Sequence, residues 1–342
     1  MKIVENDVSI EEWNRFLSND PGSTIYHTPE WKEFIERTFD FDPKYYFAKN
    51  EHDELIGVAP FFKINSRLTG NRLVSLPFSH FCGPLGSVDA TSALLSHAQS
   101  AQQKMKCSTI EIRSLKKIPK FAVNENFSTF ILKLSPQIEE VWNGLDRGSV
   151  RWAVKKSESS GVNVEITNDI ESIKEFFELN CLTKRDIGVP GHPWMYFKNL
   201  FTYVKPYVTL YSAKFKGKII AGGIMERYNG RVIYGYGAAD PDHLNLHPYN
   251  AFIWKSIEDA CRDGFISYDF GRTSQDNVGL IQFKKRWNAQ EIKLYYNNQP
   301  EPKRLNITDR DSLIFKLGNK VIRRIPMPTY KVFSKVIFSH LG

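Results

Sequence analysis

Two halves of the chain contain the same order of predicted helices and strands, and this repeat constrains the fold more than any other feature. Apolar spacing and turn residues predict, for the first half, helices at about 9–19 and 28–39, a hairpin within 45–65, a strand at 72–78, a helix at about 92–106, and strands at 108–114 and 127–135. The second half has predicted helices at about 136–159, 169–185 and 194–204, a hairpin within 207–229, a strand at 231–239, a helix at about 249–264, and strands at 266–272 and 290–296. The chain is therefore predicted to be an α/β (α+β) protein made of two copies of one unit.

The two predicted copies can be aligned residue by residue. The offsets are 164, 158 and 162 residues for the pairs Ile56 and Ile220, Ile110 and Tyr268, and Phe130 and Ile292. Such similar offsets leave room for few insertions, so the correspondence extends over most of each half. We expect the domains to span residues 1–134 and 135–300, followed by a tail at 301–342, with a ligand site in a cleft between the copies.

The composition is that of a globular protein, and its 342 residues are enough for two domains. No stretch approaches the roughly 18 apolar residues of a membrane-spanning helix. Residues 1–13 are acidic and amphipathic, without a basic and apolar leader, so we expect a cytoplasmic protein. The four cysteines lack the spacing of a zinc site and are predicted to be reduced core residues: Cys82, Cys107, Cys181 and Cys261.

The net charge of +8 is concentrated in the tail. From Lys303 onward there are nine Lys or Arg residues against two Asp, a balance of +7, and the rest of the chain is nearly neutral. Apolar residues fall on one face of each of two predicted helical pieces, which Pro326 and Pro328 separate. A basic amphipathic pair suits an anionic membrane surface, whereas packing against its own domain is an equally weighted alternative.

Several common chemistries have no motif in this sequence. The phosphate-binding loop GxxxxGK[ST], the dinucleotide motif GxGxxG, the zinc-protease motif HExxH and the hydrolase motif GxSxG are all absent. The eight histidines are scattered without a metal-binding pattern, so no metal and no bound cofactor are expected. No Cys or Ser lies with a His in a pattern that suggests a covalent enzyme, which leaves direct attack by an amine on an activated acyl group.

The segment DFGRTSQDNVGLIQFKKRWNA, residues 269–289, carries the strongest candidate for such chemistry. Asp269 and Arg272 end a predicted strand, and Phe283 and Lys284 follow a polar turn. A lysine in a cleft stabilises the oxyanion of an acyl-transfer intermediate by its charge. The neighbouring cations, at 285 and 286, are interpreted as a solvated run.

Two arginines and a tyrosine are weaker candidates for substrate binding. Arg185, in TKRDIGVPGHP, offers a bidentate donor to a phosphate or carboxylate, but an exposed arginine that offsets a helix dipole is at least as good an interpretation. Arg151 lies in the basic helix predicted over 147–166, which is either a solvated face or a surface for a polyanion. Tyr236 lies in YGYGAAD, a glycine-containing stretch that allows close approach of a ligand.

Taken together, these segments resemble the Fem family of aminoacyl-tRNA-dependent peptidyltransferases and the wider superfamily of duplicated GNAT-like acyltransferases. The segments that carry the resemblance are SVRWAVKKSESSGVNV, TKRD, YGYGAAD, HPYNAFIWKSIEDA and, most specifically, DFGRTSQDNVGLIQFKKRWNA. It implies two tandem GNAT-like subdomains, each a mixed, mostly antiparallel sheet flanked by helices, around a central cleft. It also implies that Phe283 and Lys284 border the reacting acyl group, that Arg185 contacts the acceptor, and, more loosely, that Tyr236 contacts substrate.

The sequence departs from the family pattern at two points. A precursor-binding lysine that follows the first-half tryptophan has no clear match after Trp31, and no heptad-bearing insertion forms a long helical arm. Recognition of a UDP-muramyl peptide is therefore not implied for this chain.

The resemblance implies an N-acyltransferase that moves an acyl or aminoacyl group onto an amine of a cell-envelope precursor. Lys284 and Phe283 are the expected catalytic residues, and the expected substrate-binding residues are Arg185, Tyr236, Asp269, Arg272 and Arg151. The donor would be aminoacyl-tRNA or, as the alternative, acyl-CoA. A non-catalytic module that binds an envelope precursor at the cytoplasmic face of the membrane is a hypothesis of a different class.

Overall fold

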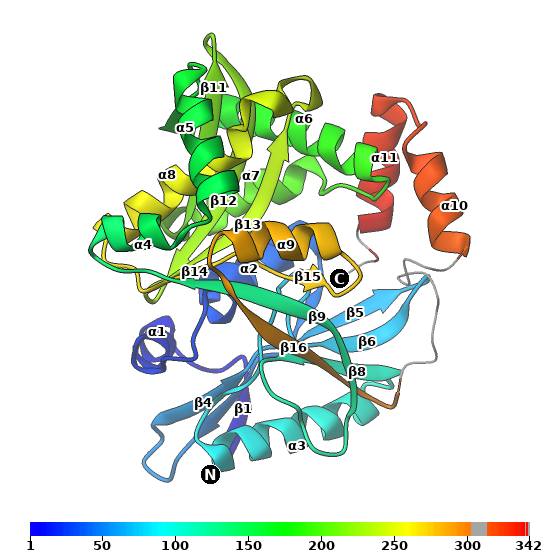
Figure 1. Ribbon diagram of the computed structural model, residues 1–342. Helices are drawn as coiled ribbons and strands as arrows, with labels where there is room; N and C mark the ends of the chain where they lie inside the picture. Colours follow the sequence, from blue (N-terminus) through cyan, green and yellow to red (C-terminus); the bar gives the residue numbers. More distant parts are fainter. Residues whose placement is uncertain (302–312, 339, 341–342) are drawn as a thin grey trace. The chain divides into compact units, whose positions relative to one another are not determined.

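The computed structural model describes residues 1–301, 313–338 and 340 (Figure 1). The chain folds into two compact units. Of these residues, unit 1 comprises 1–127, 293–301 and 340, and unit 2 comprises 128–292 and 313–338. The sequence suggested a continuous range for each domain. The structure instead has two strands, β9 (Ala122–Lys133) and β16 (Gln290–Gln299), that each contain residues of both units.

Unit 1 combines two sheets with helices α1, α2 and α3. One sheet has the strand order β1-β3-β4-β7, and the unit 1 part of the other has the order β16-β8-β6-β5-β2. The apolar face of α3 packs on β3 and β4 through Ala90, Leu94 and Ala98. The bounds are β1 Lys2–Glu5, α1 Ile10–Asn19, a 3-10 turn Ile25–His27, α2 Pro29–Phe39, β2 Asp42–Pro43, β3 Tyr46–Lys49, β4 Leu55–Ala59, β5 Phe62–Ser66, β6 Gly70–Val74, β7 Leu85–Gly86, α3 Val88–Lys104 and β8 Thr109–Ser114.

Unit 2 contains a sheet with the strand order β10-β11-β12-β13-β14-β9. Neighbouring strands are antiparallel except β13 and β14, which are parallel and are joined through α8. The bounds are α4 Ile138–Gly144, a π-helical turn Arg147–Arg151, α5 Trp152–Ser159, β10 Asn163–Ile166, α6 Ile170–Ile187, α7 Trp194–Tyr203, a 3-10 turn Lys205–Tyr207, β11 Val208–Phe215, β12 Lys218–Tyr228, β13 Arg231–Ala239, a 3-10 turn Pro241–Leu246, α8 Pro248–Arg262, β14 Ser267–Asp269, β15 Thr273–Ser274 and α9 Val278–Arg286. The predicted fold class, an α/β protein of tandem units with mixed and mostly antiparallel sheets, is confirmed.

Two adjacent glycines in β12 allow helices to approach both faces of this sheet. A Cβ atom on Gly222 would lie 3.0 Å from the ring of Phe176 in α6, and one on Gly223 would lie 2.4 Å from the ring of Phe252 in α8. Successive residues of a strand face opposite sides of its sheet. Helices α6 and α8 therefore pack on opposite faces of unit 2.

The structure corrects the predicted helices around residues 136–166. The single helix expected over 136–159 is divided into α4, the π-helical turn and α5. Gly144 and Gly148 weaken helix formation, and Asp146 accepts a hydrogen bond from Ser149 N (2.8 Å), so that a new helical segment begins there. The expected basic helix over 147–166 is also wrong at its end, because residues 163–166 form strand β10 beside β11.

The tail forms two helices, as the sequence predicts: α10 (Leu313–Ile322) and α11 (Met327–Phe338). Helix α11 packs on α6 of its own unit (Figure 1). Tyr330 of α11 is fully buried, and its hydroxyl donates a hydrogen bond to Val189 O (2.9 Å). Within the described part of the chain, no helix combines the length and apolar character needed to cross a bilayer.

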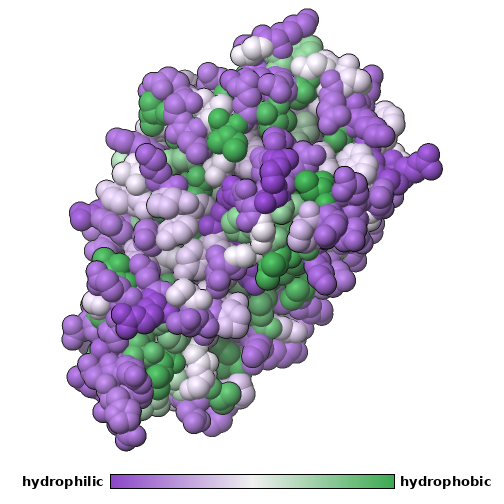
Figure 2. Space-filling view, turned by 90° about the vertical axis from the view of Figure 1, so that its left-hand side faces the viewer, coloured by the Kyte–Doolittle hydropathy of each residue, from purple (hydrophilic) through white to green (hydrophobic). Residues whose placement is uncertain are grey.

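Hydrophilic side chains cover most of the face drawn in Figure 2, and apolar side chains appear there in separate groups. That distribution is ordinary for a globular protein. The four cysteines are free thiols and all are buried, as predicted.

Candidate active site

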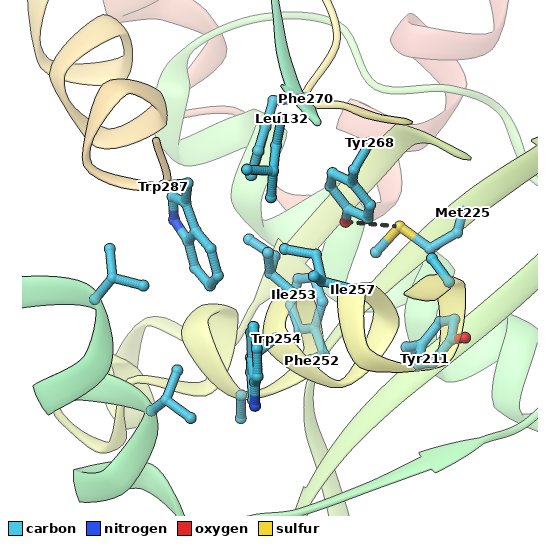
Figure 3. Packing of buried hydrophobic residues seen from close by; sticks show 14 of the residues in the cluster. Leu132, Tyr211, Met225, Phe252, Ile253, Trp254, Ile257, Tyr268, Phe270 and Trp287 are labelled. Atoms are coloured by element: carbon cyan, nitrogen blue, oxygen red, sulfur yellow. Dashed lines mark hydrogen bonds between the residues drawn. The ribbon is translucent and has the colours of Figure 1, made fainter. Parts of the chain in front are cut away.

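The segment with the strongest sequence signal contains a helix that the sequence analysis did not predict. Helix α9 begins after Asn277, whose side chain accepts a hydrogen bond from Leu280 N (3.2 Å). Ile281 and Trp287 are buried in the core of unit 2, where the Trp287 and Phe270 rings lie 5.8 Å apart (Figure 3). These apolar contacts fix the position of α9 and therefore of Lys284.

Lys284 is almost fully buried, with 3% of its surface exposed. Its Nζ atom donates a hydrogen bond to Gly271 O (2.6 Å) and lies 5.5 Å from the centre of the Phe130 ring. Burial lowers the pKa of Lys284 to about 7; the charge of Asp269 opposes this shift and the charge of Arg272 adds to it. The amine is thus poised between its charged and neutral forms near neutral pH.

Asp269, at the end of β14, is the acidic partner of Lys284 and is also fully buried. Its Oδ1 atom accepts hydrogen bonds from Gly271 N (2.8 Å) and from Thr129 Oγ1. Burial raises the pKa of Asp269, and these hydrogen bonds and the Lys284 charge act against that rise. Its other oxygen, Oδ2, is buried without a hydrogen-bond partner among the described residues.

Gly271 connects the two ionisable groups through its backbone. Its N–H binds the Asp269 carboxylate, and its carbonyl binds the Lys284 amine. Its φ of +72° lies in the left-handed region, which glycine adopts without the strain that a Cβ atom brings. A glycine after DF is therefore required for this arrangement, and the sequence DFGR supplies it.

Arg272 also acts on a second cation, Lys184 of α6, which is half-buried. Burial and the charge of Arg272 lower the pKa of Lys184, and the same arginine lowers that of Lys284. Arg272 itself is exposed at the surface. The charge of Arg272 therefore acts on both Lys184 and Lys284. Three cations in this region of unit 2 favour an anionic or electron-rich ligand.

A bulge in β13 places Tyr236 and Tyr234 on opposite faces of the sheet. Tyr236 is opposite Ile224 of β12, and Tyr234 is opposite Met225, so Gly235 is an extra residue between them. Because Ile224 and Met225 face opposite sides of the sheet, the two tyrosines do so as well. Tyr234 packs near Phe252 of α8 (ring centres 6.0 Å apart), and Tyr236 shares a hydroxyl–hydroxyl hydrogen bond with Tyr196 of α7.

Arg185 and Arg151, the two arginines proposed for substrate binding, lie on elements other than α9. Arg185 is in the last turn of α6, directly after Lys184, and its Nη2 is 4.0 Å from Asp186 Oδ1. Arg151 ends the π-helical turn and donates a hydrogen bond to Asn143 Oδ1 (3.3 Å). The Nε atom of each is buried without a partner among the described residues.

The structure therefore brings Lys284, Asp269 and Arg272 together. Phe283 precedes Lys284 on α9, is half-buried and packs against Trp287, with the ring centres 6.2 Å apart. Sequence reasoning missed Thr129 and Lys184. The TKRD segment suggested its arginine, and nothing in a single sequence indicated that Arg272 and burial lower the pKa of the lysine beside it. Among the described residues, no group of three or more His, Cys, Asp or Glu side chains is arranged to hold a metal ion.

Comparisons with known proteins agree with this architecture. Residues 146–285 match the family model described as an acetyltransferase (GNAT) domain. The crystal structure of FemX superimposes with a TM-score of 0.70 at 17% identity, covering 86% of this chain and 97% of that one. The chain has the Fem-like GNAT fold. The Fem-like fold, in its tandem form, was predicted from the sequence, and this prediction is confirmed. The match of residues 146–285 to an acetyltransferase (GNAT) domain agrees with the predicted acyltransferase class.

Two other solved structures share the Fem-like fold at lower similarity. The structure of L-PGS from Bacillus licheniformis has a TM-score of 0.57 at 12% identity, covering 94% of this chain and 99% of that one. A tandem GNAT protein from the clavulanic acid biosynthesis pathway has a TM-score of 0.54 at 11% identity, covering 87% and 97%. No curated protein sequence matched the chain.

Proposed function

We propose that the protein transfers an aminoacyl or acyl group to an amine on a cell-envelope precursor, of the peptidoglycan or lipid-linked saccharide type. The observation that carries this proposal is Lys284, a buried amine with a pKa near 7 on a helix of a Fem-like fold. A buried charge is costly unless it is paired. Lys284 has a hydrogen bond to Gly271 O and the charge of Asp269 nearby, and a ligand oxygen that develops negative charge would add a further partner.

The proposed reaction is a direct displacement at the acyl carbon. The amine of the acceptor attacks the carbonyl carbon, a C–N bond forms, and the electron pair of the C=O bond moves to the oxygen. The Lys284 ammonium has three N–H donors, of which one is bonded to Gly271 O, so the others are directed to this oxyanion. When the tetrahedral intermediate collapses, the bond to the donor breaks, and the proton from the attacking amine leaves with the departing oxygen or sulfur.

The residues around Lys284 have supporting roles in this proposal. Phe283 shapes the acyl site, and Asp269 holds part of the Lys284 population in its charged form. Arg185 and Arg272, with Tyr236, bind the acceptor, whose anionic groups suit guanidinium donors. Arg151 would contribute a further contact to an anionic group.

A second candidate donor is acyl-CoA. The match of residues 146–285 to the acetyltransferase (GNAT) domain model favours it. The chemistry at Lys284 would be the same, since a thioester and an ester both place negative charge on the carbonyl oxygen in the transition state.

The test combines a search for the product with a comparison of donors. Mass spectrometry of envelope precursors from cells with and without the gene should reveal one missing acyl increment. The purified protein is then incubated with that precursor and either charged tRNA or acetyl-CoA.

Lys284→Met should abolish transfer, and Lys285→Met is the matched control because Lys285 is exposed and paired with Glu291 (3.1 Å). Undiminished transfer by Lys284→Met would remove Lys284 from the mechanism. Precursor binding without transfer of any acyl group would instead favour the non-catalytic module.

A further inference from the structure

An apolar pocket of about 310 Å³ opens in unit 2 between α6, α7 and α11. Phe177 and Cys181 of α6, Trp194 and Met195 of α7, and Val332 of α11 contribute to its lining. Burial raises the pKa of the Cys181 thiol to about 12, so this wall is uncharged at neutral pH. The volume is at the small end of the range for ligand sites, which suits a narrow apolar group.

Two lysines of α11 stand at the edge of this pocket, one helical turn apart. Lys331 donates hydrogen bonds to both carboxylate oxygens of Glu178 (2.5 and 2.7 Å), and its Nζ lies 5.4 Å from the Phe177 ring. These contacts hold Lys331 in place and offset its charge. Lys335 is exposed, so it is the cation at this edge that is available to an anionic group.

The exposed side of α11 carries both apolar and basic residues: Val332, Val336 and Lys335. One face of α11 is buried by Tyr330, Ser334 and Phe338, and Ser334 Oγ accepts a hydrogen bond from Gly191 N (3.2 Å). On other sides, 66% of the surface of Val332 and 56% of that of Val336 are exposed. Figure 1 shows α10 beside α11.

The charge of the tail helices selects the kind of partner. Residues 313–338 include six Lys or Arg and no Asp or Glu. A second copy of this basic surface would be repelled, and an uncharged apolar partner would leave the cations without counterions. An anionic lipid bilayer supplies both hydrocarbon and negative charge.

We propose that α11 docks on an anionic membrane and that the pocket receives one hydrocarbon chain of a lipid, whose phosphate lies at Lys335. Val332 and Val336 enter the acyl-chain boundary beside it. This proposal concerns a surface distinct from Lys284 and does not depend on the transfer activity. Under this proposal both interpretations of the tail apply: one face of α11 packs on its own unit, and the opposite face would bind lipid.

The first experiment measures partition of the full chain into vesicles of equal parts phosphatidylglycerol and phosphatidylcholine, against vesicles of phosphatidylcholine alone. Binding is expected only with phosphatidylglycerol present, and it should weaken as salt is added. Lys335→Gln should reduce partition about fivefold, which is the factor for about 1 kcal/mol per surface charge. Val332→Asp should reduce it further. The matched controls are Lys218→Gln and Val88→Asp, both at exposed positions outside the tail, and neither should change partition.

The second experiment distinguishes a chain in the pocket from surface attachment alone. Vesicles whose phosphatidylglycerol carries bromine on its acyl chains quench a tryptophan that touches those chains. Wild-type fluorescence should fall on binding, and Trp194→Phe should lose most of that decrease while binding equally well. Absence of binding to phosphatidylglycerol vesicles, equal loss in the control variants, or quenching unaffected by Trp194→Phe would each overturn the proposal.

Discussion

Each unit buries a cation, Arg113 in unit 1 and Lys284 in unit 2, and the pKa of the first is raised whereas that of the second is lowered. In unit 1, Arg113 donates hydrogen bonds to Glu111 Oε1 (2.7 Å) and Ser79 O (3.3 Å), and its guanidinium lies 5.3 Å from the Tyr296 ring. Burial acts to lower the pKa of Arg113, but Glu111 and Tyr296 outweigh it, and the pKa is raised. In unit 2, Lys284 has one carbonyl partner, and its pKa falls to about 7.

The difference separates a structural charge from one available for chemistry. Arg113 is satisfied within the protein, so a ligand would have little to add. Lys284 still has N–H donors, and the charge of Asp269 offsets only part of the cost of its burial, so a negatively charged oxygen that approaches would stabilise the ammonium.

Replacing Arg113 by Met should lower the free energy of unfolding by about 3–5 kcal/mol, because the Glu111 carboxylate would lose its buried counterion. Urea denaturation of the variant and the wild type measures the loss. Lys285→Met, at an exposed ion pair, should cost less than about 1 kcal/mol. An Arg113→Met variant as stable as the wild type would show that Arg113 is not a structural charge.

Replacing Lys284 by Met should reduce turnover about 10²- to 10³-fold, the effect of losing one donor to an oxyanion. The variant should remain folded, since methionine fills a similar volume without a buried charge. Turnover and the melting temperature are measured on the same preparations. Loss of stability as large as that of Arg113→Met would assign Lys284 a structural role and end the contrast.

The wild type should become more stable as the pH rises from 7 to 9, by about 2 kcal/mol relative to Lys284→Met. In this window the unfolded chain keeps the Lys284 proton, because its pKa there is near 10.4, whereas the folded protein releases it at about 7. The state that binds more protons is disfavoured as the pH rises, so folding gains. Urea denaturation at several pH values checks this. Parallel curves for the two proteins would contradict a lowered pKa.

Replacing Thr129 by Val should lower turnover at neutral pH about tenfold, a smaller effect than loss of Lys284 itself. Without the Thr129 hydroxyl, the pKa of Asp269 rises further, and a less ionised Asp269 no longer holds Lys284 in its charged form. The apparent pKa for loss of activity at high pH should therefore decrease. Thr129→Ser restores the hydroxyl and should restore both turnover and the pH profile, a result that a packing defect would not give.

Much of the architecture could be predicted from periodicity, because the buried face of a long helix or a strand determines the spacing of its apolar residues. Helix α6 and the hairpin of β11 and β12 are examples. Helix α9 was missed because it has nine residues, a glycine at 279 and only two buried side chains, Ile281 and Lys284. Its importance came from the resemblance to the Fem family and not from its pattern.

Features that depend on contacts between residues distant in sequence could not be predicted from one sequence. The partnership of Thr129 with Asp269 spans 140 residues. The bulge at Gly235 depends on how β13 pairs with β12, and the same letters YGY fit a regular strand. The lowered pKa of Lys184 depends on Arg272, which its helix meets only after folding.

The division of β9 and β16 between the units has a consequence for synthesis on the ribosome. Strand β16 pairs with β8, and it carries Tyr296, a partner of Arg113. Unit 1 therefore lacks its last strand while residues 128–292 are translated. This interval lasts roughly 10–30 s at about 5–20 residues per second. Through that interval the nascent chain holds a charged Arg113 without its aromatic neighbour and an uncovered edge on β8. The unit that begins to emerge first therefore stays incomplete until residues 128–292 of the other unit have been made.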